Sequence, residues 1–490
     1  MRALSRVLIA VLLLFPYLIF IIRTQSFSFP EITEVANVLS FTLTQAFLSA
    51  LASVILGVWG ALGLVWVFSR FGEIFVNRVT FFLLLPNLVP ALFIILSCFQ
   101  IFKPFPFGMT GIVILHSLIN VGTVSVSIFL TLRSRFGRTI ELAYVEGASL
   151  WFFFRRAGVR LLSTDLYSLF LYVFSLCFAS FSVPLMAGKI GSNTLEVLIY
   201  EKIRVDGNLA QAIGLSLVQL LMLMGLTLMG KLKIFSTGVR ESNYKWSNLK
   251  LLSRGSGLLM PVGCVLVSLS GLFTGLLSGI EQIRSTPALV QGLPTLIMGT
   301  FLISIGTSIF CIFGLLIVAY GLPHSTFRWF LFSFVAPSSA LVGFAMFLLK
   351  RNNNNIEFIY IILGLSILIL PVLYRFRWAN LIDSLEPQIE TARTLGASWN
   401  LIFTKLVFPQ VIGEAGLLAG LAGIWASGDF AISKLVSGKN FTLAMHIDSL
   451  MSSYRINPGV TLAWVLIIVG VSVGMFFWGI GRVLGEKSYS

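Results

Sequence analysis

Long apolar runs separated by short polar segments cover almost the whole chain. Twelve of them approach or exceed the roughly 20 residues that a helix needs to cross a bilayer. The runs fall at about 7–22, 46–68, 79–101, 108–132, 165–187 and 209–230, and then at about 257–279, 295–320, 327–349, 356–376, 411–433 and 460–481. The pattern predicts an all-α integral membrane protein with about twelve transmembrane helices.

A polar segment at 231–256 divides these runs into two sets of six. We therefore expect a first unit over 1–230, a cytoplasmic linker over 231–256 and a second unit over 257–490. Because each unit contains an even number of spans, both have the same orientation in the membrane. This arrangement predicts two parallel six-helix repeats related by an axis along the membrane normal.

A polar sequence occurs twice, 249 residues apart, and supports this repeat. The stretch ELAYVEGASLWFFFRR begins at Glu141, and ETARTLGASWNLIFTK begins at Glu390. The aligned pairs are Glu141 with Glu390, Ala143 with Ala392, Gly147 with Gly396, Ala148 with Ala397, and Ser149 with Ser398. A second match, 181–195 with 430–443, follows in the same order.

Composition and charge agree with a membrane protein. Hydrophobic residues make up 57% of the chain and charged residues only 11%, against about a quarter charged in soluble domains. The net charge of +15 has no soluble basic domain to carry it, so nucleic acid is not an expected partner. With a cytoplasmic N-terminus, about two thirds of the 34 Lys and Arg residues fall inside, as the positive-inside rule requires. Both termini are then cytoplasmic.

This topology also places the two polar copies on the cytoplasmic face, at 133–164 (the first loop) and 377–410 (the second loop). In the second loop, Glu390 suits the first turn of a helix, where a carboxylate complements the helix dipole. Gly396 permits a sharp turn. After it, Trp399, Phe403 and Leu406 recur at helical spacing and form an apolar face. Such a helix is suited to a groove on another protein, or alternatively to lipid headgroups.

The pattern E-x-A-x-x-x-G-A-S resembles the EAA loop of ABC importer permeases, the membrane subunits of binding-protein-dependent uptake systems. The resemblance covers essentially the whole chain and is clearest for Glu390, Ala392, Gly396 and Ala397. The first loop departs from the pattern at Glu146, directly before the glycine, and at Arg160, where Pro409 stands in the second. Two fused units resemble the iron(III) and thiamine permeases. The stretches 194–219 and 427–459 are more similar to thiamine permeases.

The resemblance implies that the loops form coupling helices on a cytoplasmic ABC ATPase present in two copies. It also implies a periplasmic or lipid-anchored substrate-binding protein and a place in the bacterial inner membrane, in contact with lipid. ATP and Mg would bind to the partner ATPase. This chain would hold no cofactor and would not be an enzyme, because GLTLMGKL (225–232) fails the P-loop pattern at Leu232.

Other functions remain open at this point. An iron(III) permease would share every feature above. A secondary transporter of the major facilitator type also has six plus six spans, and SRFGEIFVNR (69–78) partly resembles its charged loop. A membrane scaffold or receptor would bind a partner without transport. Sequence topology alone does not separate parallel six-span repeats, and the paired loops favour the ABC permease.

Polar residues within apolar runs are candidates for the substrate path. A carboxylate at mid-membrane costs about 2.5–3.5 kcal/mol on insertion scales and usually faces a cavity or partner. Asp429 lies near the outer end of the run at 411–433 and aligns with Ser180 of the first unit. It either attracts a cation or is an interfacial residue that caps a short loop. His116 and Asn120 lie four residues apart on one helix face, where they either line the path or bond between helices. The sequence predicts no metal site.

Overall fold

The computed structural model describes residues 2–23, 28–133, 145–189, 193–229, 255–321, 339–350, 356–437 and 440–489. The helices of the first half are α1 (Arg2–Arg23), α2 (Ile32–Leu88), α3 (Ala91–Ile101), α4 (Met109–Thr131), α6 (Leu150–Phe153), α7 (Val159–Phe178), α8 (Ser182–Ala187), α9 (Leu195–Arg204) and α10 (Leu209–Met229). The linker predicted at 231–256 lies almost entirely outside the described residues, so its boundaries stay a prediction.

The second half contains α11 (Leu259–Thr274), α12 (Leu276–Ser285), α13 (Leu293–Gly321), α15 (Ser339–Lys350), α16 (Glu357–Leu373), α17 (Ala379–Ser384), α18 (Glu386–Thr394), α19 (Trp399–Ile402), α20 (Phe408–Ser427), α21 (Ala431–Val436), α22 (Leu443–Ser452) and α23 (Ile456–Tyr489). In the described part of the chain, eight helices are long and apolar enough to span a membrane, and four shorter apolar helices accompany them. Together they fall in all twelve predicted runs, and residues 327–338 of the run at 327–349 lie outside the described part of the chain. The all-α membrane fold is confirmed.

The repeat in the sequence is also a repeat in helix bounds. In the first half, α6 is followed by a π-helical turn at Phe154–Gly158, then α7 and α8. In the second half, α19 is followed by a π-helical turn at Phe403–Val407, then α20 and α21. Each first-half element begins 249 residues before its counterpart. The two halves therefore share one local architecture despite few identical residues.

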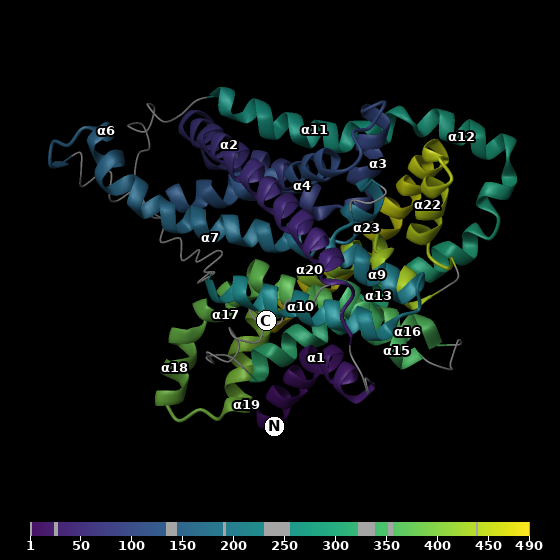
Figure 1. The fold of residues 1–490 in the computed structure, drawn as a ribbon. Coiled ribbons are helices and arrows are strands. Elements are labelled where there is room, and N and C mark those ends of the chain that lie inside the picture. The colour runs from purple at the N-terminus through teal and green to yellow at the C-terminus, as the bar shows by residue number, and fades with distance from the viewer. Residues whose placement is uncertain are drawn as a thin grey trace.

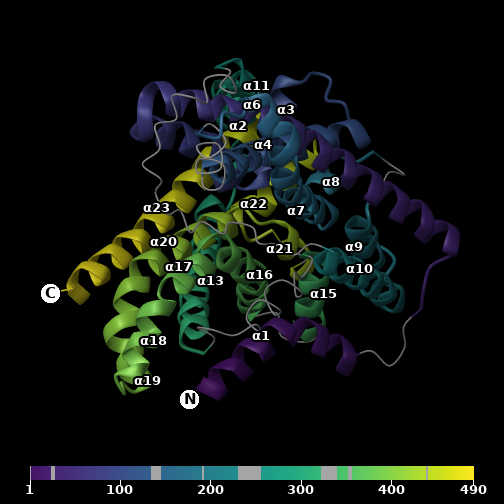
Figure 2. The same cartoon turned by 90° about the vertical axis from the view of Figure 1, so that its left-hand side faces the viewer.

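The first helix of each half packs on the other half. Helix α1 lies against α13 and α15, and α11 lies against α2, α3 and α4 (Figures 1 and 2). On the first side, Arg6 Nε donates to the Gly321 carbonyl at 2.9 Å. On the second, Ser97 Oγ donates to the Val267 carbonyl at 2.8 Å and accepts from the Gly271 N–H at 2.9 Å. This exchange joins the halves independently of the linker.

Several predicted spans are interrupted in the structure. The run at 79–101 is divided between the end of α2 and α3, because Pro90 lacks an N–H and forces Val89 into an extended conformation (φ −95°, ψ 143°). The predicted loop 69–78 lies within α2, which is kinked at Gly72 (φ +80°). The runs at 165–187 and 411–433 each end in a separate short helix, α8 and α21.

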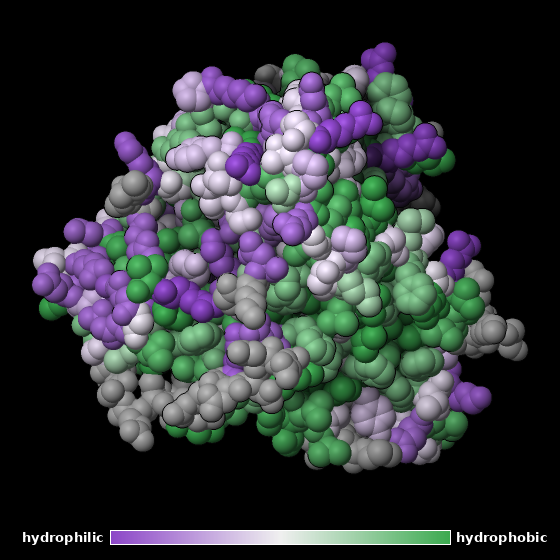
Figure 3. Space-filling view, turned by 90° about the vertical axis from the view of Figure 1, so that its right-hand side faces the viewer, coloured by the Kyte–Doolittle hydropathy of each residue, from purple (hydrophilic) through white to green (hydrophobic). Residues whose placement is uncertain are grey.

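Large apolar side chains are exposed along the long helices, as expected for contact with lipid. Examples are Leu4, Phe313, Met298 and Met475, each at least 60% exposed. In water such surfaces would be an aggregation liability, whereas in lipid they are favourable. Figure 3 shows one face of the molecule, with hydrophilic side chains over its upper part and left flank and apolar ones over much of the lower right.

Candidate functional site

The second loop contains a helix that ends at a glycine in a left-handed conformation. Gly396 has φ +81°, its N–H donates to the Arg393 carbonyl at 2.9 Å, and the Ala397 N–H donates to the Ala392 carbonyl at 3.1 Å. This pair of bonds is a Schellman motif, in which glycine is preferred because it has no Cβ. Glu390 lies exposed on α18, so the predicted residues of this loop lie together around one turn.

Aromatic contacts fix the base of this turn to the transmembrane helices. The Tyr320 ring, on the last turn of α13, packs edge-on against Phe403 at 5.0 Å between centroids. Its hydroxyl donates to Asn400 Oδ1 at 2.8 Å. Two apolar side chains are open on the outer face of the turn, with Leu395 82% exposed and Leu401 51% exposed. The turn therefore has a base that is fixed to α13 and exposed apolar side chains at its tip.

The first loop repeats this turn in the part that the structure describes. Gly147 has φ +74°, close to the value at Gly396, and Ala148 and Ser149 follow it. Ser149 Oγ accepts the Phe152 N–H at 3.2 Å and so caps α6, whereas the Ser398 side chain makes no such bond to α19. Glu141 and Ala143 lie outside the described residues, so their predicted roles stay predictions.

The different caps give a testable difference between the loops. Replacing an N-cap serine by alanine costs about 1 kcal/mol, which corresponds to roughly fivefold faster local opening. We expect Ser149→Ala to speed amide hydrogen exchange in α6 by about this factor. Ser398→Ala is the matched control and should leave exchange in α19 unchanged. Equal effects of the two substitutions would contradict the assigned cap.

Both loops project on the same side of the molecule. Figure 1 shows α6 and the α18–α19 pair on the left, and Figure 2, viewed from that side, separates them from top to bottom. Near the second loop, Arg377 Nη2 lies 2.7 Å from Glu414 Oε1 and forms an ion pair with it. Glu414 is the carboxylate in the first part of the predicted run at 411–433. Two similar turns therefore lie at separate points of one face.

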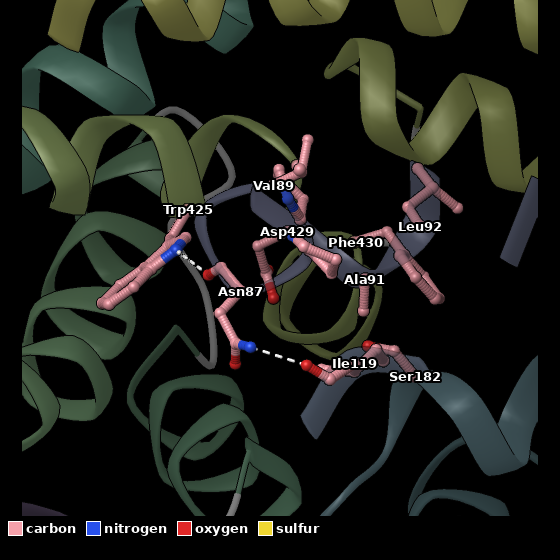
Figure 4. Close-up of a pocket in the computed structure, with 12 residues that line it drawn as sticks. Asn87, Val89, Ala91, Leu92, Ile119, Ser182, Trp425, Asp429 and Phe430 are labelled. Carbon is pink, nitrogen blue, oxygen red and sulfur yellow. Dashed lines mark hydrogen bonds between the residues drawn. The ribbon is translucent and has the colours of Figure 1, made fainter. Parts of the chain in front are cut away.

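A cavity of about 250 Å³ lies between the two halves. Its walls come from the α2–α3 junction, α4 and α8 of the first half and from the α20–α21 junction of the second (Figure 4). The lining residues are Pro86, Asn87, Val89, Pro90, Ala91, Leu92, Ile119, Ser182, Trp425, Gly428, Asp429 and Phe430. The helix breaks that the hydropathy pattern did not predict form much of this wall.

Hydrogen bonds hold the polar groups of the cavity in place. Asn87 Nδ2 donates to the Ile119 carbonyl at 2.6 Å, and Trp425 Nε1 donates across the halves to the Asn87 carbonyl at 3.1 Å. Asp429 Oδ2 accepts the Ile432 and Ser433 N–H groups at 3.1 and 3.3 Å. Asp429 therefore caps the start of α21 and also lines the cavity, and its attraction of a cation stays a prediction.

The other three path candidates do not line this cavity. His116 is buried, with Nδ1 3.4 Å from Ser49 Oγ. Asn120 donates to the His116 carbonyl at 2.8 Å and lies 3.8 Å from Cys177 Sγ. Ser180 lies in the α7–α8 connection, where its N–H donates to the Cys177 carbonyl at 3.4 Å. These contacts are packing contacts within the first half.

Sequence reasoning missed Asn87, Trp425 and Ser182 as lining residues. Asn87 carried a usable signal, because an amide between Pro86 and Pro90 in an apolar run marks a break with a polar group at membrane depth. Trp425 and Ser182 carried none, since neither residue type is unusual within a helix.

Comparisons with known proteins agree with the membrane fold and the repeat. The chain is 24% identical over 473 residues to the thiamine transport system permease protein ThiP of Salmonella typhimurium, covering 88% of this chain and 87% of that protein. It is 28% identical over 282 residues to ThiP of Escherichia coli, a match that spans 53% of this chain and 52% of that one. No family model matches the chain, and no solved structure gives a significant match. Over most of its length, this multi-pass membrane protein resembles the fused two-unit permeases of ABC importers, of the thiamine and iron(III) type.

Proposed function

We propose that this chain is the permease subunit of an ATP-driven importer for thiamine or its phosphates. The observation that carries the proposal is the pair of glycine turns at Gly147 and Gly396, in corresponding positions of the two halves and on one side of the molecule. The thiamine permeases to which the chain is similar support the substrate. In this proposal the chain lies in the bacterial inner membrane with both termini in the cytoplasm.

We propose one kind of partner at the face that carries the two loops and another at the opposite face. Two copies of a cytoplasmic ABC ATPase dock on the two loops, with Glu141, Ala143, Gly147, Ala148 and Ser149 in one contact and Glu390, Ala392, Gly396, Ala397 and Ser398 in the other. ATP and Mg bind to that partner. A periplasmic or lipid-anchored binding protein delivers substrate at the opposite face. The chain itself performs no covalent chemistry.

The proposed cycle is alternating access between the two halves. Closure of the ATPase dimer moves the two loops together, and Tyr320 and the π-helical turn pass that motion to α13 and α20. Because α1 and α11 each pack on the opposite half, the halves stay joined while they rock. The cavity between them then opens to one side at a time.

Transport by the reconstituted complex tests this proposal. The permease is placed in proteoliposomes with its ATPase, ATP inside and the binding protein outside, and labelled thiamine or ferric iron is offered. We expect thiamine accumulation that requires both ATP and the binding protein. Without the ATPase, accumulation should fall to background.

Other results would redirect the proposal in defined ways. Accumulation of iron instead of thiamine would retain the mechanism and overturn the substrate. Uptake driven by an ion gradient alone would overturn the role of the loops and favour a secondary transporter.

A further inference from the structure

The cavity between the halves has an asymmetric distribution of charge. Asp429 is the one ionisable residue among the twelve that line it. The corresponding position of the first half carries Ser180, which has no charge and does not line the cavity. A substrate in this cavity therefore meets a negative charge on the wall of the second half alone (Figure 4).

No cation of the described residues compensates this charge. Among the described residues, no Lys or Arg side chain forms an ion pair with the Asp429 carboxylate within 4.0 Å. The nearest cation in sequence, Lys434 on α21, is 2.7 Å from Asp448 Oδ2 instead. The two N–H groups at Oδ2 orient the carboxylate, and a carboxylate has about four lone-pair sites in all. The Asp429 carboxylate therefore keeps lone-pair sites that can contact a positively charged ligand.

The rest of the lining is suited to an organic ligand. Apart from Asp429, the polar side chains are the Asn87 amide, the Ser182 hydroxyl and the Trp425 indole, and the other residues are apolar. The bond from Trp425 Nε1 to the Asn87 carbonyl fixes the indole in the wall. The Trp425 ring and the Asp429 carboxylate both line this cavity. An aromatic ring attracts organic cations through its quadrupole, and a carboxylate attracts them through its charge.

The same lining is unsuited to a bare metal ion. Hard cations take several oxygen ligands, commonly including more than one carboxylate. Among the described residues no group of three or more His, Cys, Asp or Glu side chains is placed to hold a metal. The volume of about 250 Å³ also approaches the roughly 300–1,000 Å³ of small-molecule sites.

We infer that this cavity is a station on the path for an aromatic organic cation, with Asp429 balancing its positive charge and Trp425 contacting its ring. The inference rests on the proposed function and deepens it, because thiamine carries a permanently charged thiazolium ring. It also separates the two substrates that the sequence left open, since ferric iron would find one carboxylate here.

Charge selectivity of transport tests the inference. Vesicles take up either thiamine or a neutral analogue in which thiophene replaces the thiazolium ring. Because every sample uses the same binding protein at saturation, its own preference cancels when variants are compared with wild type. We expect Asp429→Asn to reduce the thiamine-to-analogue uptake ratio at least tenfold. Asp429→Glu, which keeps the charge, should retain most of that ratio.

Controls separate charge recognition from loss of structure. Asp429→Ser supplies a second neutral variant if Asp429→Asn assembles poorly, and ATP hydrolysis stimulated by the binding protein reports assembly of each complex. Asp206→Asn removes an exposed carboxylate paired with Lys202 on α9 and should leave the ratio unchanged. An unchanged ratio in Asp429→Asn, or an equal loss in Asp429→Glu, would overturn the inference.

The proposed function fails in a different way. Wild-type vesicles that take up no thiamine despite active ATP hydrolysis would overturn thiamine as substrate before any variant is compared. Ferric iron uptake that is unaffected by Asp429→Asn would overturn the organic-cation station and the thiamine substrate together.

Discussion

Gly396→Asp should abolish ATP-driven uptake while the protein still inserts and folds. The substitution places a carboxylate on the exposed tip of the second loop, where a Cβ meets nothing within 4 Å. If this tip docks on the ATPase as proposed, the carboxylate becomes buried without a partner. An unpaired buried charge at an interface costs about 2–5 kcal/mol, which corresponds to a loss of affinity of roughly 30-fold to several-thousand-fold.

Folding alone does not account for a loss of that size. A residue other than glycine at φ +81° costs about 1–2 kcal/mol, and Asp tolerates this region better than most residues. Wild-type amounts of Gly396→Asp in the membrane, together with loss of ATPase co-purification and of uptake, are therefore expected. Membrane yield, pull-down and uptake measure the three quantities on one preparation.

Gly292→Asp is the matched control for this experiment. Gly292 has φ +75°, and a Cβ added there would also meet nothing within 4 Å, so the local strain is similar. It lies before α13, on the face that the proposed topology places outside the cell. We expect it to retain ATPase binding. Normal uptake by Gly396→Asp, or equal losses in both variants, would remove the docking role of the second loop.

The sequence predicted the parts of this fold that depend on local composition. Apolar runs gave all twelve helical regions, and the E-x-A-x-x-x-G-A-S pattern located the turn at Gly396. That turn was predictable because a left-handed C-terminal cap requires glycine almost regardless of surroundings. Asp429 was also found, since a carboxylate in an apolar run is costly enough to need a reason.

The sequence did not predict where the runs break or which residues meet. Hydropathy does not distinguish a continuous span from α20 followed by α21, because both are apolar. The cavity wall unites Asn87 with Trp425, residues of different halves, through a hydrogen bond to a backbone carbonyl. Such a contact depends on the packing of α2 against α20 and leaves no local signal. The exchange of α1 and α11 between halves was unpredictable for the same reason.

Gly271→Leu should separate the two halves if they are produced as two chains. We expect residues 1–240 and 241–490, expressed together, to assemble, because α1 and α11 each pack on the opposite half. At Gly271 a Cβ would lie 2.1 Å from the Ser97 carbonyl oxygen, far inside van der Waals contact. Overpacking costs about 1–3 kcal/mol, and loss of the bond from the Gly271 N–H to Ser97 Oγ costs about 1 kcal/mol more.

Together these costs predict that recovery of the second chain with a tagged first chain falls by at least tenfold. Gly263→Leu is the matched control on the same helix, because a Cβ there meets nothing within 4 Å, and its recovery should equal wild type. If Gly271→Leu also co-purifies fully, the α3–α11 contact does not hold the halves together. Other contacts between the halves, such as those of α1 with α13 and α15, would then hold them together.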